Sequence, residues 1–218
     1  MPSILIIECS TPRATVALVD AEEVQQRAFT SDRNHNAMLF EPLGQLLAGR
    51  RDIERVLVGT GPGSYGGTRV GIAAAQGIGL AFGCPVVGVP SILAVPAAES
   101  GASCLAIGDA RRGSYWTAAI HANELGREPQ LCDADSLIRA ISSAATCNTP
   151  IFAFEQAAQF PVEELQSLIR LEYPIASLLW KAWQNSSPQQ RAAWQAEVAQ
   201  PIYLKPPHIT PGKREKLI

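Results

Sequence analysis

The sequence predicts an α/β fold made of two domains, of which the second is a degenerate version of the first. The first hundred residues open on three apolar runs and then alternate helix-like with strand-like segments, and a weaker series of apolar runs begins again near residue 104. A chain of 218 residues with 47% apolar side chains is long enough to bury two small cores. We place the two domains at residues 1–100 and 101–218.

Short apolar runs and turn residues define the elements of the first domain. Two short apolar runs and a plausible third strand predict an opening antiparallel meander. Capping residues before apolar residues at helical spacing predict the first helix. The predicted elements are strands at 3–8, 15–19, 24–30, 56–59 and 84–89 and helices at 36–48, 70–82 and 91–99. Three antiparallel strands followed by α/β units are the layout of a ribonuclease-H-like domain, as in actin, sugar kinases and Hsp70, which is an analogy of fold.

The second domain begins in the same way and then loses the pattern. A strand and its hairpin partner are followed by segments rich in Ala, Gln, Leu and Trp. The predicted elements are strands at 104–108, 114–121 and 151–154, helices at 133–143 and 162–171, and one or two helices within 174–199. Residues 205–218 combine prolines with basic residues and are expected to be loosely ordered.

A glycine-rich stretch, Gly59 to Gly71, connects a predicted strand to a predicted helix. Pro62 and Gly63 fit the central positions of a type II turn, in which Gly63 takes a positive φ. Unpaired N–H groups at the start of the helix and the helix dipole favour an anion there. The candidate residues for an anion or nucleotide are Glu8, Ser10, Thr11, Gly63, Ser64 and Arg111. The alternative is that the glycines only let the helix pack closely on the strand.

Three known motifs are close to this stretch, and each lacks one essential residue. A dinucleotide fingerprint needs an acidic residue about 20 positions after the glycines, and none occurs between Glu54 and Glu99. A phosphate-binding loop needs a lysine where Gly67 stands. A nucleophile elbow needs a glycine where Pro62 stands. These three classes of site are therefore disfavoured.

Composition disfavours several further classes. The net charge of −2 gives no broad basic surface for nucleic acid, five scattered cysteines indicate reduced thiols, and three histidines far apart in sequence predict no metal site. The chain starts without a leader-like segment, and no apolar run is long enough for a bilayer. We therefore expect a cytoplasmic protein without membrane contact.

Several segments together resemble the bacterial TsaB (YeaZ) family. They are Ile4 to Leu18 with Glu8-Cys9-Ser10-Thr11, the helix start from His35 to Leu43, Gly61-Pro62-Gly63-Ser64-Tyr65-x-Gly67-x-Arg69-x-Gly71, Asp109-Ala110-Arg111-Arg112 and Pro201-x-Tyr203-Leu204-Lys205. The glycine segment is the most specific of these. The chain departs from the family pattern at Glu8, Gly66 and Thr68, where the family usually has Asp, Thr and an apolar residue.

The resemblance implies a two-domain actin-like fold and a non-catalytic role. Members of the family are partners of the enzyme TsaD in making N6-threonylcarbamoyladenosine at position 37 of tRNAs that read codons starting with A. The implied partners are TsaD, TsaE, a second copy of the chain when it is alone, and tRNA through the complex only. The one candidate cofactor is ATP or ADP at the interface of the complex.

Two predicted helices carry more apolar and small residues than packing on one sheet requires. Gly71, Ala75 and Gly79 recur at every fourth position, so this stripe allows the close approach of another helix. The resemblance points to the same two helices as the surface that pairs with TsaD. The predicted interface residues are Met38, Leu39, Leu43, Leu46, Thr68, Arg69, Gly71, Ile72, Ala75, Gln76 and Gly79. The alternative is that both helices only pack on their own sheet.

Two further expectations concern single residues. Arg69 at the start of a helix opposes the helix dipole, which indicates a carboxylate or phosphate partner, with a solvated side chain as the alternative. Tyr115, Trp116 and Tyr203 have apolar neighbours in sequence, so we expect them in the core rather than on a base-stacking surface.

An enzymatic alternative remains open. A nucleotide-dependent kinase or hydrolase, or a peptidase of the same fold, would need an activated nucleophile, and the sequence assigns no base to Ser64. We therefore predict no catalytic residue and a non-catalytic subunit.

Overall fold

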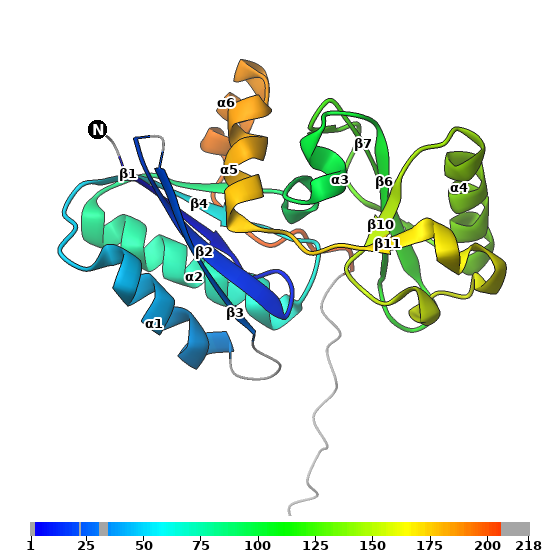
Figure 1. The fold of residues 1–218 in the computed structure, drawn as a ribbon, viewed down its shortest axis with the longest axis horizontal. Helices are drawn as coiled ribbons and strands as arrows, with labels where there is room; N and C mark the ends of the chain where they lie inside the picture. The colour runs from blue at the N-terminus through cyan, green and yellow to red at the C-terminus, as the bar shows by residue number, and fades with distance from the viewer. Residues whose placement is uncertain (1–2, 22, 31–34, 206–218) are drawn as a thin grey trace, which may run out of the picture.

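A computed structural model describes residues 3–21, 23–30 and 35–205 of the chain (Figure 1). Two β-sheets lie side by side, each with helices packed against it, as expected for a two-domain ribonuclease-H-like fold. The predicted loose order of residues 205–218 concerns a segment that, apart from Lys205, lies outside the described residues. No helix of the described part combines the length and hydropathy that a membrane span needs.

The first sheet has five strands in the order β3-β2-β1-β4-β5. Its strands are β1 (Ser3–Glu8), β2 (Arg13–Asp20), β3 (Glu23–Thr30), β4 (Ile53–Gly59) and β5 (Val86–Val89). The first three strands pair antiparallel, whereas β4 and β5 run parallel to β1. The opening meander and the α/β units after it are thereby confirmed. The carboxyl ends of β1 and β4 meet at one edge, which is where parallel α/β sheets bind ligands.

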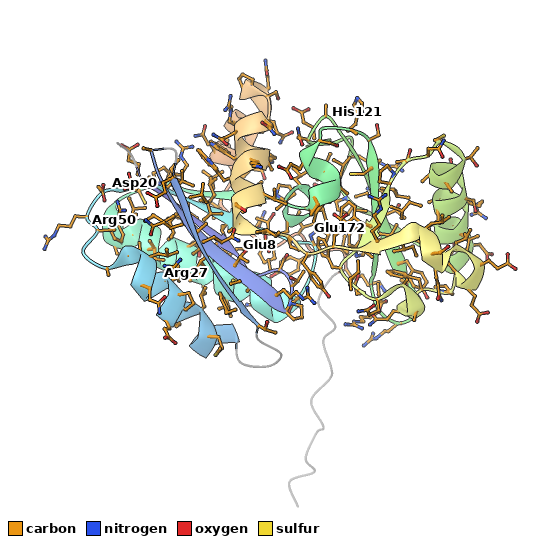
Figure 2. All side chains as sticks on the ribbon, viewed as in Figure 1. Glu8, Asp20, Arg27, Arg50, His121 and Glu172 are labelled. Atoms are coloured by element: carbon orange, nitrogen blue, oxygen red, sulfur yellow. The ribbon has the colours of Figure 1, made fainter. Side chains whose placement is uncertain are left out.

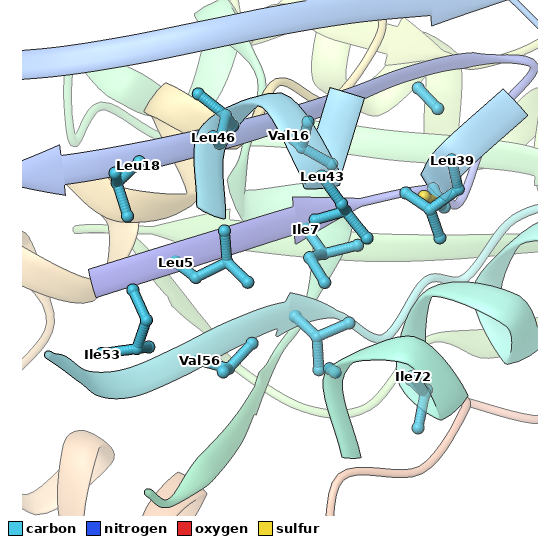
Figure 3. Packing of buried hydrophobic residues seen from close by; sticks show 14 of the residues in the cluster. Leu5, Ile7, Val16, Leu18, Leu39, Leu43, Leu46, Ile53, Val56 and Ile72 are labelled. Carbon is cyan, nitrogen blue, oxygen red and sulfur yellow. The ribbon is translucent and has the colours of Figure 1, made fainter. Parts of the chain in front are cut away.

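Helices cover both faces of this sheet (Figure 1). They are α1 (His35–Leu47) and α2 (Tyr65–Phe82) on one face and α5 (Ala176–Asn185) on the other. Figure 3 shows Leu43 of α1 beside Ile7 of β1, and both belong to one buried cluster with Leu39 and Leu5. Between them in sequence, Ile6 points to the opposite face and packs with α5, because side chains alternate along a strand. The central strand β1 is therefore buried on both faces.

The second sheet repeats the order of the first. Its path is β11-β10-β6-β7-β8, with β9 also paired to β7. Its strands are β6 (Cys104–Asp109), β7 (Tyr115–His121), β8 (Glu124–Leu125), β9 (Gln130–Cys132), β10 (Ile151–Ala153) and β11 (Ile169–Leu171). As β1 does in the first sheet, β6 pairs antiparallel with the next strand and parallel with a later one. The remaining elements are η1 (Ser91–Leu93), α3 (Pro96–Glu99), α4 (Ala134–Thr146), η2 (Ala157–Gln159), η3 (Glu163–Leu168) and α6 (Pro188–Ala196).

Several element predictions were wrong in their details. The helix expected at 162–171 is a 3-10 helix followed by strand β11, because its last three residues pair with β10. The helix expected at 91–99 is interrupted before Pro96, whose ring cannot continue the preceding turn. Strands β8 and β9 were not predicted, since two or three residues are too few for a recognisable alternation.

The division at residue 100 does not describe the packing of α5. Leu179 and Trp183 of this helix belong to the core of the first sheet, with Leu57 of β4 among their neighbours. The N–H of Ala176 also donates to Thr15 Oγ1 at 2.8 Å. The chain therefore returns to the first domain after completing the second sheet.

Candidate ligand cleft and helix surface

The glycine-rich stretch connects β4 to α2 through a constrained loop. Gly61 has a φ of +85° and precedes a cis peptide bond to Pro62, while Gly63 does not have a positive φ. The predicted type II turn was therefore wrong, because the left-handed residue comes before the proline. The N–H of Gly61 donates to Ser91 Oγ and the N–H of Ser91 donates to the Gly61 carbonyl, both at 2.9 Å. This pair of bonds fixes the loop against the segment that follows β5.

Gly63 is required for close packing rather than for a turn. A methyl group at this position would overlap the carbonyl oxygen of Ser10. The neighbouring Ser64 N–H donates to that same oxygen at 2.6 Å. The Ser64 hydroxyl caps α2 by accepting from the N–H of Gly67 at 3.3 Å. The loop therefore joins the start of α2 to the end of β1.

Glu8 ends β1 at the junction with this loop, and Figure 2 labels its side chain. Its side chain is fully buried, and its Oε1 accepts from the Ser10 N–H at 2.7 Å. No hydrogen-bond partner for Oε2 is found among the described residues. Burial raises the pKa of Glu8, because a carboxylate loses its hydration there, and the hydrogen bond from the Ser10 N–H only partly offsets this.

A cleft of about 760 Å³ lies between the two domains. One wall comes from the end of β1 and the start of α2, and the other from the end of β6 and the segment after β10. Five of the six predicted anion-site residues line it: Ser10, Thr11, Gly63, Ser64 and Arg111. Glu8 is not among the lining residues, since it is buried behind Ser10. The Ser10 hydroxyl is buried and finds no partner among the described residues.

The second wall of the cleft carries two carboxyl groups and one arginine. Asp109 accepts from the Arg111 N–H at 2.6 Å and pairs with its guanidinium at 3.2 Å. Arg111 has a φ of +67°, which is a left-handed backbone conformation, and in this conformation its N–H donates to the Asp109 carboxylate. Burial and the nearby charge of Asp109 raise the pKa of Glu155 to about 7. This half of the cleft is therefore partly acidic and changes charge near neutral pH.

The C-terminal described residues cross from one domain to the other beside the cleft. The N–H of Ile202 donates to the Thr60 carbonyl at 2.9 Å, and Gln76 Nε2 donates to the Ala199 carbonyl at 3.2 Å. Lys205 Nζ then reaches the Arg111 carbonyl at 3.0 Å. We call residues 199–205 the C-terminal strap. The strap also separates the cleft from a second cavity of about 530 Å³.

Sequence reasoning missed Glu155 and misplaced Tyr203. Glu155 follows β10, whose carboxyl end meets that of β6. An acidic residue just after a strand at this edge of the sheet could have indicated a residue of the ligand cleft from the sequence. Tyr203 was expected in the core but is 52% exposed, because the strap lies on the surface. The expectation for Trp116 is confirmed, since it is buried, and Tyr115 is half-buried.

Most of the predicted interface residues face the chain's own sheet. Ala75 is fully buried, and methyl groups at Gly71 and Gly79 would contact Ile7 or Cys9 and Val86, respectively. The small-residue stripe therefore lets α2 lie close to β1 and β5 and is not open to another helix. The other predicted interface residues that are buried are Leu39, Leu43, Leu46, Thr68 and Ile72. Those that remain exposed are Met38, Arg69 and Gln76.

Larger apolar side chains do project from the outer surface of these helices. Phe40 of α1 is 62% exposed and Leu80 of α2 is 86% exposed. Met38 adds a third exposed apolar side chain. We call Met38, Phe40 and Leu80 the outer apolar residues of α1 and α2.

Three kinds of comparison relate the chain to known proteins. The family model described as "TsaD: tRNA N6-adenosine threonylcarbamoyltransferase" matches residues 26–130. A protein of Escherichia coli K12 named tRNA threonylcarbamoyladenosine biosynthesis protein TsaB is 30% identical over 131 residues, which are 56% of this chain and 57% of that protein. An uncharacterized protein of Mycobacterium tuberculosis H37Rv is 32% identical over 121 residues, 52% of this chain and 57% of its own. The match thus spans little more than half the length of these relatives.

Solved structures agree over a larger part of the chain. YeaZ from Pseudomonas aeruginosa superposes with a TM-score of 0.68 at 20% identity, covering 94% of this chain and all of that chain. A structure described as an uncharacterized protein with similarity to peptidase YeaZ from the same organism gives a TM-score of 0.69 at 19% identity, with the same coverage. These likenesses show the fold. In sequence, the chain is similar to TsaB proteins over about half of its length.

Proposed function

We propose that this chain is a non-catalytic subunit that binds TsaD in the synthesis of N6-threonylcarbamoyladenosine at position 37 of tRNA. The relatives named for the biosynthesis of this nucleoside support the pathway. The observation that carries the partner role is the set of outer apolar residues of α1 and α2. Large apolar side chains that stay exposed on the outer surface of helices are typical of an interface with another protein.

This contact surface differs from the one expected from the sequence, in which the stripe of small residues on α2 would pair closely with a helix of TsaD. The outer apolar residues would enter pockets of TsaD, while exposed Arg69 and Gln76 would lie at the margin. When the chain is alone, the same residues would join two copies in a homodimer that TsaD displaces. TsaE and a nucleotide would join through the assembled complex, with the cleft residues Ser10 and Ser64 as candidate nucleotide contacts, and the complex as a whole would act on tRNA.

A non-catalytic role is also supported by the surroundings of Ser64. Its hydroxyl accepts the N–H of Gly67 as the cap of α2. The described histidine side chain, His121, pairs with Ser103 at 2.8 Å. Turnover of ATP or of a peptide by the purified chain alone, lost on Ser64→Ala, would support the alternative of an enzyme of the same fold.

Size-exclusion chromatography with light scattering tests the proposed partner. The wild-type chain mixed with TsaD is expected to elute as a 1:1 complex. Leu80→Arg and Phe40→Arg are expected to weaken that complex by at least about tenfold, because a buried unpaired charge costs more than 1.4 kcal/mol. Leu131→Arg is the matched control, since Leu131 is a half-exposed leucine on the second sheet. Complexes of equal stability with all variants would refute this surface, and no complex with wild type would refute the partner.

A further inference from the structure

Two exposed tyrosines and an arginine form a cluster at the mouth of the cleft. The ring centroids of Tyr65 and Tyr203 are 5.9 Å apart, with the planes inclined by 44°. Arg69 lies over the Tyr65 ring at 5.0 Å and donates to its hydroxyl at 2.5 Å. The two tyrosines are 57% and 52% exposed. We call Tyr65, Tyr203 and Arg69 the aromatic platform.

The platform is held in place by buried structure on both sides. Tyr65 is the first residue of α2 and directly follows the capping Ser64. Tyr203 follows Ile202, whose N–H is bonded to the Thr60 carbonyl at the end of β4. Each ring therefore projects from a backbone that the core fixes, so binding a flat ligand would require little ordering.

Positive charge lies beside the rings. Among the described residues, no carboxylate lies within ion-pair distance of Arg69 or Lys205. Lys205 is two residues after Tyr203 and lies next to the backbone of Arg111. Aromatic rings beside unpaired cations are the combination that binds a base and its adjoining phosphate.

We propose that the aromatic platform stacks an unpaired base of single-stranded RNA, with the adjoining phosphates at Arg69 and Lys205. The choice of RNA over DNA rests on the function proposed above. A free nucleotide fits less well, because small ligands are mostly enclosed by their site, whereas both tyrosines are more than half exposed.

Fluorescence anisotropy of the full chain with a labelled RNA hairpin tests this inference. The probe carries an unpaired loop, and a fully paired duplex of the same composition serves as the comparison. We expect Tyr203→Leu to weaken hairpin binding by roughly tenfold or more, because the variant lacks the ring on which the base stacks. Tyr203→Phe keeps the ring and is expected to bind within about twofold of wild type. Leu131→Ala, at an exposed apolar residue on the second sheet, is expected to bind like wild type.

The role of Arg69 is tested through the salt dependence of the same binding. Each phosphate contact adds about one to the slope of log affinity against log salt. Arg69→Gln is therefore expected to lower that slope by about one, while the preference for hairpin over duplex is kept. An unchanged slope would refute the phosphate contact.

Each of the following outcomes would overturn the platform. The Tyr203→Leu variant could bind the hairpin like wild type, or lose TsaD binding while its RNA binding is unchanged. The wild-type chain could bind the hairpin and the duplex equally. ATP could displace the hairpin at the concentration expected for a mononucleotide site. A wild-type chain that binds TsaD but no RNA would refute the platform and leave the proposed function intact. RNA binding without any TsaD complex would refute the proposed partner instead.

Discussion

The first strands of the two sheets end in the same local structure but in different surroundings. β1 ends at Glu8, whose Oε1 accepts the N–H of Ser10 at 2.7 Å. β6 ends at Asp109, whose Oδ1 accepts the N–H of Arg111 at 2.6 Å. In both places an acidic side chain bonds the N–H two residues ahead, as Asx-type turns do. The short-range chemistry of the two strand ends is therefore the same.

The neighbouring parallel strand makes the difference between them. Beside β1, strand β4 ends in Gly59, which leaves room for the Glu8 carboxyl group to be buried. Beside β6, strand β10 is followed by Glu155, so a second carboxyl group stands near Asp109. Glu8 is thus enclosed with no ion-pair partner in the described part of the chain, whereas Asp109 lines the cleft and pairs with Arg111. The residue beside each strand end, Gly59 or Glu155, thus contributes to the different surroundings of the two acidic side chains.

The largest effect is expected from removing the space that Gly59 provides. A methyl group there would overlap the Glu8 carboxyl group and approach Ser91 Oγ. We expect Gly59→Ala to lower the free energy of unfolding by about 3 kcal/mol in urea denaturation. Adding Glu8→Ala to this variant should recover part of the lost free energy of unfolding, because the Glu8 carboxyl group that the new methyl group overlaps is then absent.

Gly66→Ala is the matched control for this substitution. A methyl group at Gly66 meets nothing within 4 Å, and the residue lies in the first turn of α2. We expect this variant to be more stable than wild type by up to about 1 kcal/mol, because alanine loses less backbone entropy in a helix. Equal stability of the two alanine variants would contradict the role assigned to Gly59.

The next effect concerns Glu8 itself. Glu8→Ala removes the acceptor of the Ser10 N–H and leaves a cavity, so we expect a loss of about 2–3 kcal/mol. Glu8→Gln keeps an acceptor without a charge, and at pH 8 it should be at least as stable as wild type. Thermal unfolding of both variants checks this order. A Gln variant as unstable as the Ala variant would show that the buried carboxyl group has a partner outside the described residues.

The pH dependence of stability provides a third test, on the second sheet. The pKa of Glu155 is about 7 in the folded protein and near 4.5 when unfolded. Between pH 4.5 and pH 7 the folded state therefore binds more protons than the unfolded state. The stability that the neutral Glu155 contributes is fully present below about pH 4.5 and is lost as the pH rises to 7. We expect Glu155→Gln to gain at most about 3 kcal/mol over wild type at pH 8 and almost nothing at pH 4.5. Parallel pH profiles of wild type and variant would contradict the raised pKa.

The smallest effect is expected at Asp109. Asp109→Asn keeps an oxygen acceptor for the Arg111 N–H and loses only the ion pair to a guanidinium that is 80% exposed. Exposed ion pairs contribute little, so the free energy of unfolding should change by less than about 1 kcal/mol. The same substitution should lower the pKa of Glu155, because the charge of Asp109 helps raise it. A titration of Glu155 by NMR in both proteins measures this shift.

The sequence by itself determined the order of the first elements and the resemblance to the TsaB (YeaZ) family. Apolar alternation and helical spacing are short-range patterns, so the opening meander, the glycine loop and the first α/β units could be predicted from them. The five cleft residues were found because they lie at strand ends and at a helix start. The same patterns could not tell which face of α2 is covered, since Gly71 and Ala75 suit contact with a sheet as well as with a helix.

Only the tertiary structure decided burial and charge. The return of α5 to the first sheet joins Ala176 to Thr15 across 161 positions, a contact that no local pattern encodes. Enclosure of Glu8 depends on Gly59 and Ser91, and the pKa of Glu155 depends on Asp109. Exposure of Tyr203 likewise follows from the path of the C-terminal strap rather than from its apolar neighbours. Solvation of a side chain is set by segments distant in sequence, which is why these properties appear only when the chain is folded.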